Sequence, residues 1–310
     1  MNNYLKKIEL FIDHNYWTNT LGLARSLLAL STLLTLSFNN VELLFYSGIL
    51  NENTPNVSEF GLNIYTWFPK LEYGYWFSII ILILTITGIY PRIICVFHWL
   101  VAYSFFTLAT IADGGDQITS ILTLLLIPIC IFDKRKWHWS TVKYMHNFYS
   151  KCVSAIFYEL IRVQVFIVYF VASVGKFSVE EWKNGTVLYY WFNEPLFGVR
   201  DFFQPFVDFL TNSPILITLT TWSVLIIELL IAFSYFSRNQ KIKSIALYTG
   251  IFFHFGILLF FGLVSFFLVM TASLILFLTS KNYNYEYRSV NFLSAFRGFN
   301  NIFSNSTQKS

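Results

Sequence analysis

The chain has 310 residues, of which 55% are hydrophobic, 20% are aromatic and only 12% are charged. Soluble domains carry roughly a quarter charged residues, so this composition excludes an ordinary soluble domain and favours a protein that crosses the membrane several times. The net charge of +4 excludes little, because the placement of basic residues in a membrane protein is more informative than their sum.

Eight apolar segments are predicted to span the membrane, since a spanning helix needs roughly 17–25 mostly apolar residues. In chain order they are Leu21–Phe38, Tyr73–Tyr90, Ile93–Ala112, Gln117–Phe132, Ile156–Gly175, Pro214–Phe236, Ser244–Phe261 and Leu263–Thr279. The last two form one continuous apolar stretch that is too long for one span. Gly262 is the predicted turn between them, and one long helix is the alternative. The predicted fold is an all-α polytopic membrane protein with interfacial helices.

Basic residues favour one orientation of these spans. With the N-terminus inside, fifteen of the 21 basic residues lie in inside segments and two, Arg25 and Arg162, lie within spans. The other four, Lys70, Lys176, Lys183 and Arg200, lie outside. This bias follows the positive-inside rule and predicts that both termini are cytoplasmic.

The chain divides into three predicted regions. Residues 1–20 mix charged and aromatic side chains, which is typical of an interfacial segment. Residues 20–280 form the transmembrane domain, and residues 281–310 form a polar cytoplasmic tail rich in Asn and Ser. The sequence shows no His, Asp and Glu cluster at metal-ligand spacing and no motif for nucleic acid, so we predict neither a metal site nor a nucleic-acid partner. Membrane lipid is an expected partner.

The fifth span has a polar stripe. Arg162, Tyr169, Ser173 and Lys176 share one helix face because steps of three, four and seven residues keep a face nearly constant. Glu159 lies beside them and is predicted to form an ion pair with Arg162. Lys176 is either a lysine that extends to water at a helix end or a chemical group held at the membrane face.

Other ionisable residues in or near spans leave similar alternatives. Glu228 and His254 form either a structural hydrogen-bonded pair or a proton-transfer pair. Asp113 and Asp116, in "IADGGDQ", serve either a tight turn or the binding of a cation or substrate amine. Arg25 lies near the inner end of the first span, where water or a carboxylate partner explains it as well as function does.

Several of these stretches resemble a known membrane domain. In chain order, "LGLARSLLALSTLLTLSF", "ADGGDQITSILTLLLIPI", "RVQVFIVYFVASVGKFSVEEWKNGTVLYYWF", "WSVLIIELLIAF" and "FFHFGILLF" look like the HTTM domain shared with vitamin K-dependent gamma-carboxylases. The N-terminal stretch and chain length are more similar still to the SdpB family. Those bacterial membrane proteins mature a secreted sporulation-delaying, cannibalism-type antimicrobial peptide from an SdpC-like precursor, alongside an SdpA-like partner.

The resemblance implies roles for particular residues. Lys176 falls where the carboxylases keep an active-site lysine that acts as a base, while Glu228, His254 and Asp116 match polar positions of HTTM proteins. The sequence departs from the carboxylases at Gly175, which replaces the first of two adjacent lysines. It also stops at Ser310, without their large luminal domain, so we expect substrate handling to involve a partner or the outer segments.

Together these inferences predict a bacterial cytoplasmic-membrane protein needed for proteolytic maturation of such a peptide. We expect a cavity open to the outer face, bounded by the first, fifth, sixth and seventh spans. The predicted catalytic residues are Lys176, as base or nucleophile, with His254 and Glu228 setting its protonation. The predicted substrate-binding or supporting residues are Asp116, Asp113, Trp182, Tyr169, Ser173 and Arg25.

The reaction class and the cofactor are left open by the sequence. Lysine-assisted cleavage and a lysine-driven modification that licenses cleavage elsewhere are both compatible with it. The alternatives are a carboxylase-like or quinol-dependent peptide-modifying enzyme and a non-catalytic scaffold, export or immunity component.

Overall fold

The structure is a computed structural model that describes residues 12–45, 61–140, 147–194, 198–199 and 201–279. Within these ranges the chain is helical, and its one extended pairing is an isolated bridge between Ile89 and Trp137. Most of the predicted N-terminal segment, up to residue 11, and the predicted cytoplasmic tail lie outside the described residues.

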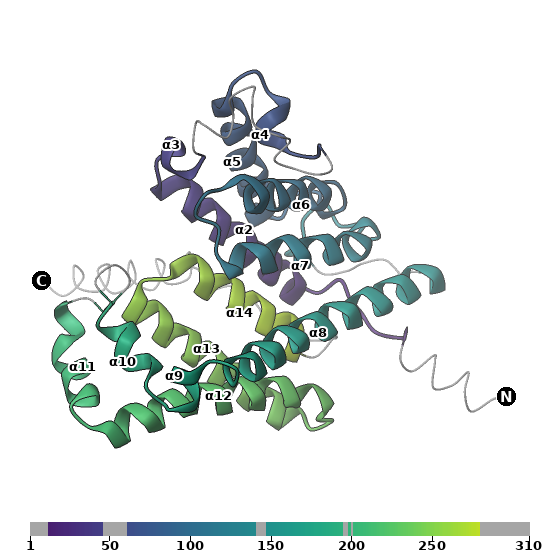
Figure 1. The fold of residues 1–310 in the computed structure, drawn as a ribbon. Coiled ribbons are helices and arrows are strands. Elements are labelled where there is room, and N and C mark those ends of the chain that lie inside the picture. The colour runs from purple at the N-terminus through teal and green to yellow at the C-terminus, as the bar shows by residue number, and fades with distance from the viewer. Residues whose placement is uncertain (1–11, 46–60, 141–146, 195–197, 200, 280–310) are drawn as a thin grey trace, which may run out of the picture.

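Eight apolar helices form the described part of the fold, in the order of the eight predicted spans (Figure 1). They are α2 (Asn19–Phe38), α5 (Leu71–Thr87), α6 (Pro91–Leu108), α7 (Gly114–Ile131), α8 (Phe148–Lys176), α12 (Pro214–Phe233), α13 (Gln240–Phe261) and α14 (Val264–Leu278). Six of them are long and apolar enough to cross a membrane, while α5 and α14 are shorter, at 17 and 15 residues. The fold class predicted from the sequence is therefore confirmed.

Local sequence explains where these helices begin and end. The α8 helix starts eight residues before the predicted span, because the side chain of Asn147 accepts a hydrogen bond from the backbone N–H of Ser150 and caps it. Gly262 ends α13 with a φ of 73°, in the left-handed region that favours glycine. The predicted turn at Gly262 is confirmed, and the single long helix is excluded.

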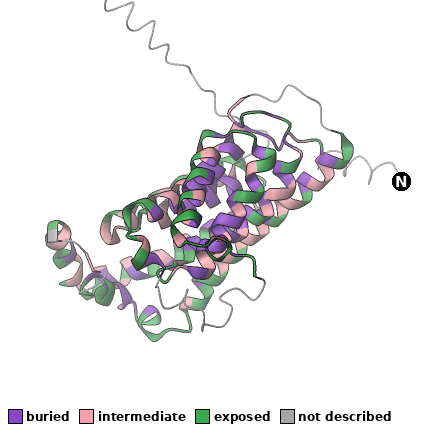
Figure 2. Ribbon diagram, turned by 90° about the horizontal axis from the view of Figure 1, so that it is seen from above, coloured by how far each residue is buried: buried purple, intermediate pink, exposed green. Residues whose placement is uncertain are grey.

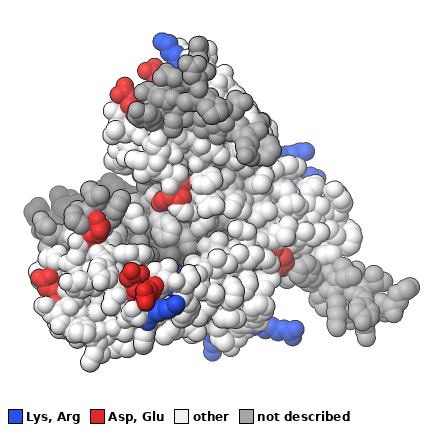
Figure 3. All heavy atoms as spheres, in the orientation of Figure 1, with Lys and Arg blue, Asp and Glu red and all other residues white. Residues whose placement is uncertain are grey.

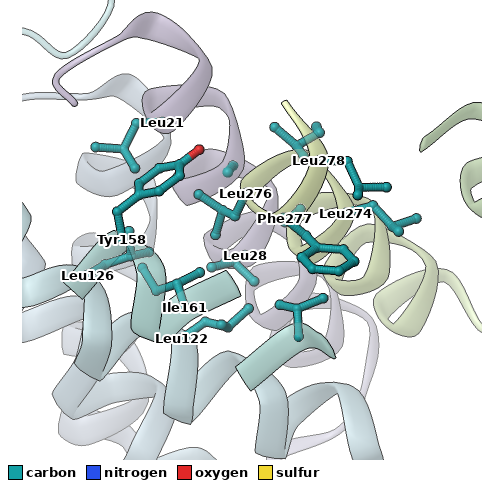
Figure 4. Close-up of a cluster of buried hydrophobic side chains, with 14 of the residues drawn as sticks. Leu21, Leu28, Leu122, Leu126, Tyr158, Ile161, Leu274, Leu276, Phe277 and Leu278 are labelled. Carbon is teal, nitrogen blue, oxygen red and sulfur yellow. The ribbon is translucent and has the colours of Figure 1, made fainter. Parts of the chain in front are cut away.

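The helices form two groups that meet at α14 and where α7 packs against α8. One group contains α2, α5, α6 and α7, and the other contains α8, α12 and α13 (Figure 1). The α14 helix contacts α2, α7, α8 and α13. Its residues from Leu274 to Leu278 are all buried, and they pack with Leu28, Leu122 and Ile161 in the main core (Figure 4).

Short helices cover the ends of both groups. The α3 (Val41–Leu44) and α4 (Ile64–Trp67) helices contribute to a core shared with α2, α5 and α6. Between α8 and α12 lie α9 (Glu180–Lys183), α10 (Val187–Phe192), the 3₁₀ turn η1 (Asp201–Phe203) and α11 (Gln204–Thr211). Trp182, Val187, Leu188, Phe192 and Val207 of this region pack on the first half of α12 in a third core.

Exposed apolar side chains form a stripe along α12. They are spaced three or four residues apart, which places them on one face of the helix: Ile215, Leu219, Trp222, Ile226, Leu230 and Phe233. Figure 2 shows exposed residues along the outer faces of the bundle, and the face in Figure 3 has few charges separated by broad uncharged areas. Such a surface suits contact with lipid hydrocarbon rather than with water.

Candidate functional site

An ion pair joins α8 and α12 in the interior of the second helix group. Nζ of Lys176 donates to both carboxylate oxygens of Glu228, at 2.5 and 2.6 Å. The side chain of Lys176 is 20% exposed and that of Glu228 is 9% exposed. Two opposite charges so shielded from water stabilise one another, and each would be costly alone.

The direction of the Lys176 side chain follows from helix geometry. Side chains in an α-helix lean towards its N-terminus, so a lysine in the last turn of α8 points back along the helix. Ser173, one turn earlier, fixes the register by donating its hydroxyl hydrogen to the carbonyl oxygen of Leu225, at 3.1 Å. The pair thus forms 14 residues after Pro214, about 21 Å along α12. The side chain of Lys176 therefore points back into the helix group, towards α12.

Trp182 covers this ion pair from the segment that follows α8. Its ring centroid lies 5.1 Å from Nζ of Lys176, within the range of a cation–π interaction. Gly185 fixes the position of this segment, because its φ is 72° and a Cβ there would lie 2.6 Å from the methyl group of Thr218. The close approach of Gly185 to α12 therefore holds Trp182 over Lys176.

A second polar pair joins α8 to α13. The hydroxyl of Tyr169 and Nε2 of His254 are hydrogen-bonded at 2.7 Å, and both side chains are buried. Nδ1 of His254 is buried as well, and it has no hydrogen-bond partner among the described residues. An unpaired polar atom in an apolar interior is costly and points to a missing water or ligand.

Glu228 and His254 do not pair with one another as the sequence predicted, because each binds a residue of α8, but the two resulting pairs lie within electrostatic reach of one another. The Glu228 charge interacts electrostatically with Tyr169, and the Lys176 charge does so with His254. Predicted residues from α8, α12 and α13 therefore converge: Lys176, Ser173 and Tyr169 from α8, Glu228 from α12 and His254 from α13. Because Ser173 donates to Leu225, its hydroxyl hydrogen is engaged away from Lys176.

Asp113 and Asp116 lie at the start of α7 and bind one another's backbone. The Asp113 carboxylate accepts from the Asp116 N–H, and the Asp116 carboxylate accepts from the Asp113 N–H, each at 3.0 Å. This reciprocal arrangement is a capping box. A Cβ on Gly115 would lie 3.4 Å from Cα of Phe266, and the Phe266 ring lies 5.6 Å from that of His254. Gly115, between the two aspartates, thus lies against Phe266, which separates this turn from His254.

Arg25 belongs to a different cluster. Its Nη1 lies 3.3 Å from Nδ1 of His138, and Ser26 Oγ lies 3.4 Å from Nε2 of the same imidazole. Because arginine can only donate, Nδ1 accepts and the ring hydrogen is on Nε2. Nε2 donates to Ser26, whose hydroxyl donates to the carbonyl oxygen of Ile86 at 3.2 Å. Both ring nitrogens of His138 and the hydroxyl of Ser26 therefore have partners.

The turn that supplies His138 is held by a buried ion pair that sequence reasoning missed. Arg135 binds both carboxylate oxygens of Asp133 and donates through Nη1 to the carbonyl oxygens of His138 and Ser140. From the sequence, Arg135 is one of several basic residues after the fourth span. Nothing in "DKRKWHW" distinguishes the buried arginine from the exposed lysines on either side.

The predicted pair of Glu159 and Arg162 is present, with Nη1 of Arg162 3.0 Å from each carboxylate oxygen.

In the part of the chain that the structure describes, no group of three or more His, Cys, Asp and Glu side chains is arranged to hold a metal ion. The candidate site is therefore built from a lysine, a glutamate, a tyrosine and a histidine.

Comparison with known proteins identifies the family. The HTTM domain model matches residues 18–281. Sporulation-delaying protein SdpB of Bacillus subtilis (strain 168) is 38% identical over 286 residues, which cover 88% of this chain and 85% of that protein. Uncharacterized protein YitO of the same strain is 36% identical over 284 residues, which cover 90% of this chain and 91% of that protein. No solved structure matches. With its apolar helices and this similarity, the chain belongs to the SdpB family of HTTM-domain, multi-pass membrane proteins.

Proposed function

We propose that this protein acts in a sporulation-delaying system, where it is required for proteolytic maturation of a secreted antimicrobial peptide. Its similarity to Sporulation-delaying protein SdpB over most of both chains supports a role in such a system. The proposal includes an SdpC-like precursor, an SdpA-like partner, a bacterial cytoplasmic membrane and cytoplasmic termini.

The observation that supports a chemical role most directly is the Lys176–Glu228 pair. Nζ of Lys176 lies 2.5 Å from Oε1 of Glu228, so a proton on Nζ is directed at a carboxylate that can accept it. In a site shielded from water, transfer of this proton removes both charges and leaves Lys176 as a neutral amine. A neutral amine is a base, and it takes a proton from a water molecule that attacks the scissile carbonyl of the precursor. The same proton then passes to the leaving amine.

The second pair supplies the contact with substrate in this proposal. His254 is fixed by Tyr169 through Nε2, so its unpartnered Nδ1 has a defined direction. A backbone N–H or C=O of the precursor satisfies Nδ1, according to which tautomer is present. Trp182 lies over the amine and limits the access of bulk water.

The test is maturation of the precursor by protein that lacks the amine. The protein would be expressed with its precursor and partner as wild type, as Lys176→Ala and as Lys183→Ala. Lys183 is an exposed lysine seven residues away, so its removal controls for loss of one charge. The secreted peptide would be weighed by intact mass spectrometry, with membrane insertion measured for each variant.

We expect a trimmed peptide from the wild type and from Lys183→Ala, and none from Lys176→Ala. A secreted peptide that has gained a chemical group would indicate that the reaction at this lysine is a carboxylase-like or other modification, and not cleavage. A normal peptide from Lys176→Ala would refute a chemical role for Lys176 and favour a scaffold, export or immunity component.

A further inference from the structure

A cationic recess lies far from the Lys176 site, where the connection between α12 and α13 meets the first half of α8. Its volume is about 730 Å³, and the residues that line it include Glu159, Arg162, Tyr235, Ser237, Arg238 and Lys243. Arg162 precedes Lys176 by 14 residues on α8, which corresponds to about 21 Å along the helix. The chemistry proposed for Lys176 does not involve this recess.

The described residues that line the recess carry an excess of positive charge. Arg162, Arg238 and Lys243 contribute three cations, and Glu159 contributes one carboxylate, which leaves an excess of two. Glu159 is occupied by Nη1 of Arg162. Arg238 is exposed and makes no ion pair within the described ranges of the chain. An anion is therefore the ligand that this charge distribution favours.

Contacts within the protein fix the side chain of Arg162 in the absence of a ligand. Its Nε donates to the carbonyl oxygen of Phe277 at 3.1 Å, and its guanidinium carbon lies 5.0 Å from the ring centroid of Tyr235. With Nη1 bound to Glu159, only Nη2 makes no hydrogen bond to a described residue. A fixed guanidinium loses little freedom on binding, and its geometry matches that of a phosphate.

Exposed apolar side chains continue from the recess along the bundle. Phe233 is exposed at the end of α12 and Phe236 in the 3₁₀ turn that follows (Ser234–Phe236), and Leu230 continues the exposed stripe away from the recess. On α13, Ile242 and Ile245 are exposed on either side of Lys243. A cationic recess beside an apolar strip complements a ligand with an anionic head and hydrocarbon chains.

We infer that this recess binds the phosphate headgroup of an anionic phospholipid, whose acyl chains lie along the exposed apolar face of α12. Arg162, Arg238 and Lys243 contact the phosphate, as basic recesses between membrane helices do for anionic headgroups. The apolar strip selects a lipid over free phosphate, because a free anion leaves Phe233 and Phe236 uncovered.

Lipid binding by the purified full chain in a neutral detergent tests this inference. Bound lipid would be counted by native mass spectrometry during titration with phosphatidylglycerol, or with phosphatidylcholine of the same acyl chains. Inorganic phosphate would be added as a competitor in a separate arm. The variants are Arg238→Gln, Arg238→Gln with Lys243→Gln, and Arg92→Gln, which removes an exposed arginine from the first turn of α6.

Each cation near a headgroup contributes roughly a fivefold change in affinity, so the double variant should bind phosphatidylglycerol about 25-fold more weakly. Arg238→Gln alone should bind phosphatidylglycerol about fivefold more weakly. This single variant keeps the test valid if the Lys243 change disturbs the fold. Arg92→Gln and all titrations with phosphatidylcholine should match the wild type.

Three results would overturn the inference. Equal losses in Arg92→Gln and Arg238→Gln would indicate a general effect of net charge. An unchanged affinity of the double variant for phosphatidylglycerol would show that the recess is not the binding site. Displacement of the lipid by inorganic phosphate at a similar concentration would identify a free anion as the ligand in place of a lipid.

Discussion

Replacing the two members of the Lys176–Glu228 pair, singly and together, separates its structural role from its chemical role. At an effective dielectric constant of about 20 and a charge separation of about 3 Å, the attraction is about 5 kcal/mol. Most of this offsets the loss of hydration, since Glu228 is 9% exposed and Lys176 is 20% exposed. Lys176→Met or Glu228→Met alone should therefore destabilise the protein by about 3–5 kcal/mol, because each leaves an unpaired charge.

The double variant, Lys176→Met with Glu228→Met, should behave differently. It leaves no unpaired charge and keeps a similar volume, so its free energy of unfolding should lie within about 1.5 kcal/mol of the wild type. The two single losses together exceed the loss in the double variant, so the double-mutant cycle should give a coupling energy of about 4.5 kcal/mol or more. Thermal unfolding in detergent, followed by tryptophan fluorescence, measures stability, and intact mass of the secreted peptide measures maturation.

The expected combination is a double variant that folds and does not support maturation. Restored maturation in the double variant would refute the proposed chemistry, because two methionines cannot share a proton. Single variants that are each as stable as the wild type would instead refute the buried ion pair itself.

Three further outcomes follow from other contacts. Tyr169→Phe should destabilise the protein by about 1–3 kcal/mol in the same unfolding assay, since it leaves Nε2 of His254 unpaired; no change would mean that water replaces the hydroxyl. Gly185→Ala should cost at least about 1–2 kcal/mol and reduce maturation, because its φ is 72°, and full activity would show that this turn does not position the site. Burial, and then the two arginines beside it, lower the pKa of His138 to about 2. The unfolded chain therefore binds more protons below about pH 6.5, and stability should fall there by up to roughly 1.4 kcal/mol per pH unit from this group. His138→Asn should reduce that slope between pH 7 and pH 5, and an identical slope would exclude His138 as its source.

Much of the fold could be predicted from the sequence because apolar segments have few alternatives in a membrane. The eight apolar helices correspond in order to the eight predicted segments. Gly262 also ends α13 where its position in an over-long apolar stretch indicated. Helix starts were harder, since α8 extends back to Phe148 through residues such as Lys151 that hydropathy excludes from a span. Its start depends on the Asn147 cap, a local contact that hydropathy does not register.

Side-chain direction limited what could be predicted about the site. The spacing of Tyr169, Ser173 and Lys176 indicated one helix face, and the structure places all three towards α12 or α13. The sequence placed Lys176 at the outer membrane face because it ends an apolar segment. Helix geometry directs its side chain back to Glu228 in α12, a residue already expected to act on its protonation. The depth of a residue in a helix and the depth of its charged atom differ by the length of the side chain.

Arg25 and Lys176 show why hydrogen bonding, and not burial alone, distinguishes the two polar clusters. Both are basic residues near the end of an apolar helix, and sequence position gave each an equally plausible structural explanation. Around Arg25, the imidazole of His138 has partners at both ring nitrogens, and Ser26 passes its hydrogen to a backbone oxygen. Around Lys176, the ion pair is satisfied, but Nδ1 of the neighbouring His254 is buried without a described partner. A histidine with both ring nitrogens paired gains no hydrogen bond from a ligand, whereas His254, with a fixed and unpaired Nδ1, gains one. This difference directs the proposed chemistry to Lys176 and His254, while His138 and Ser26 link α2 to the turn after α7 and, through the carbonyl oxygen of Ile86, to α5.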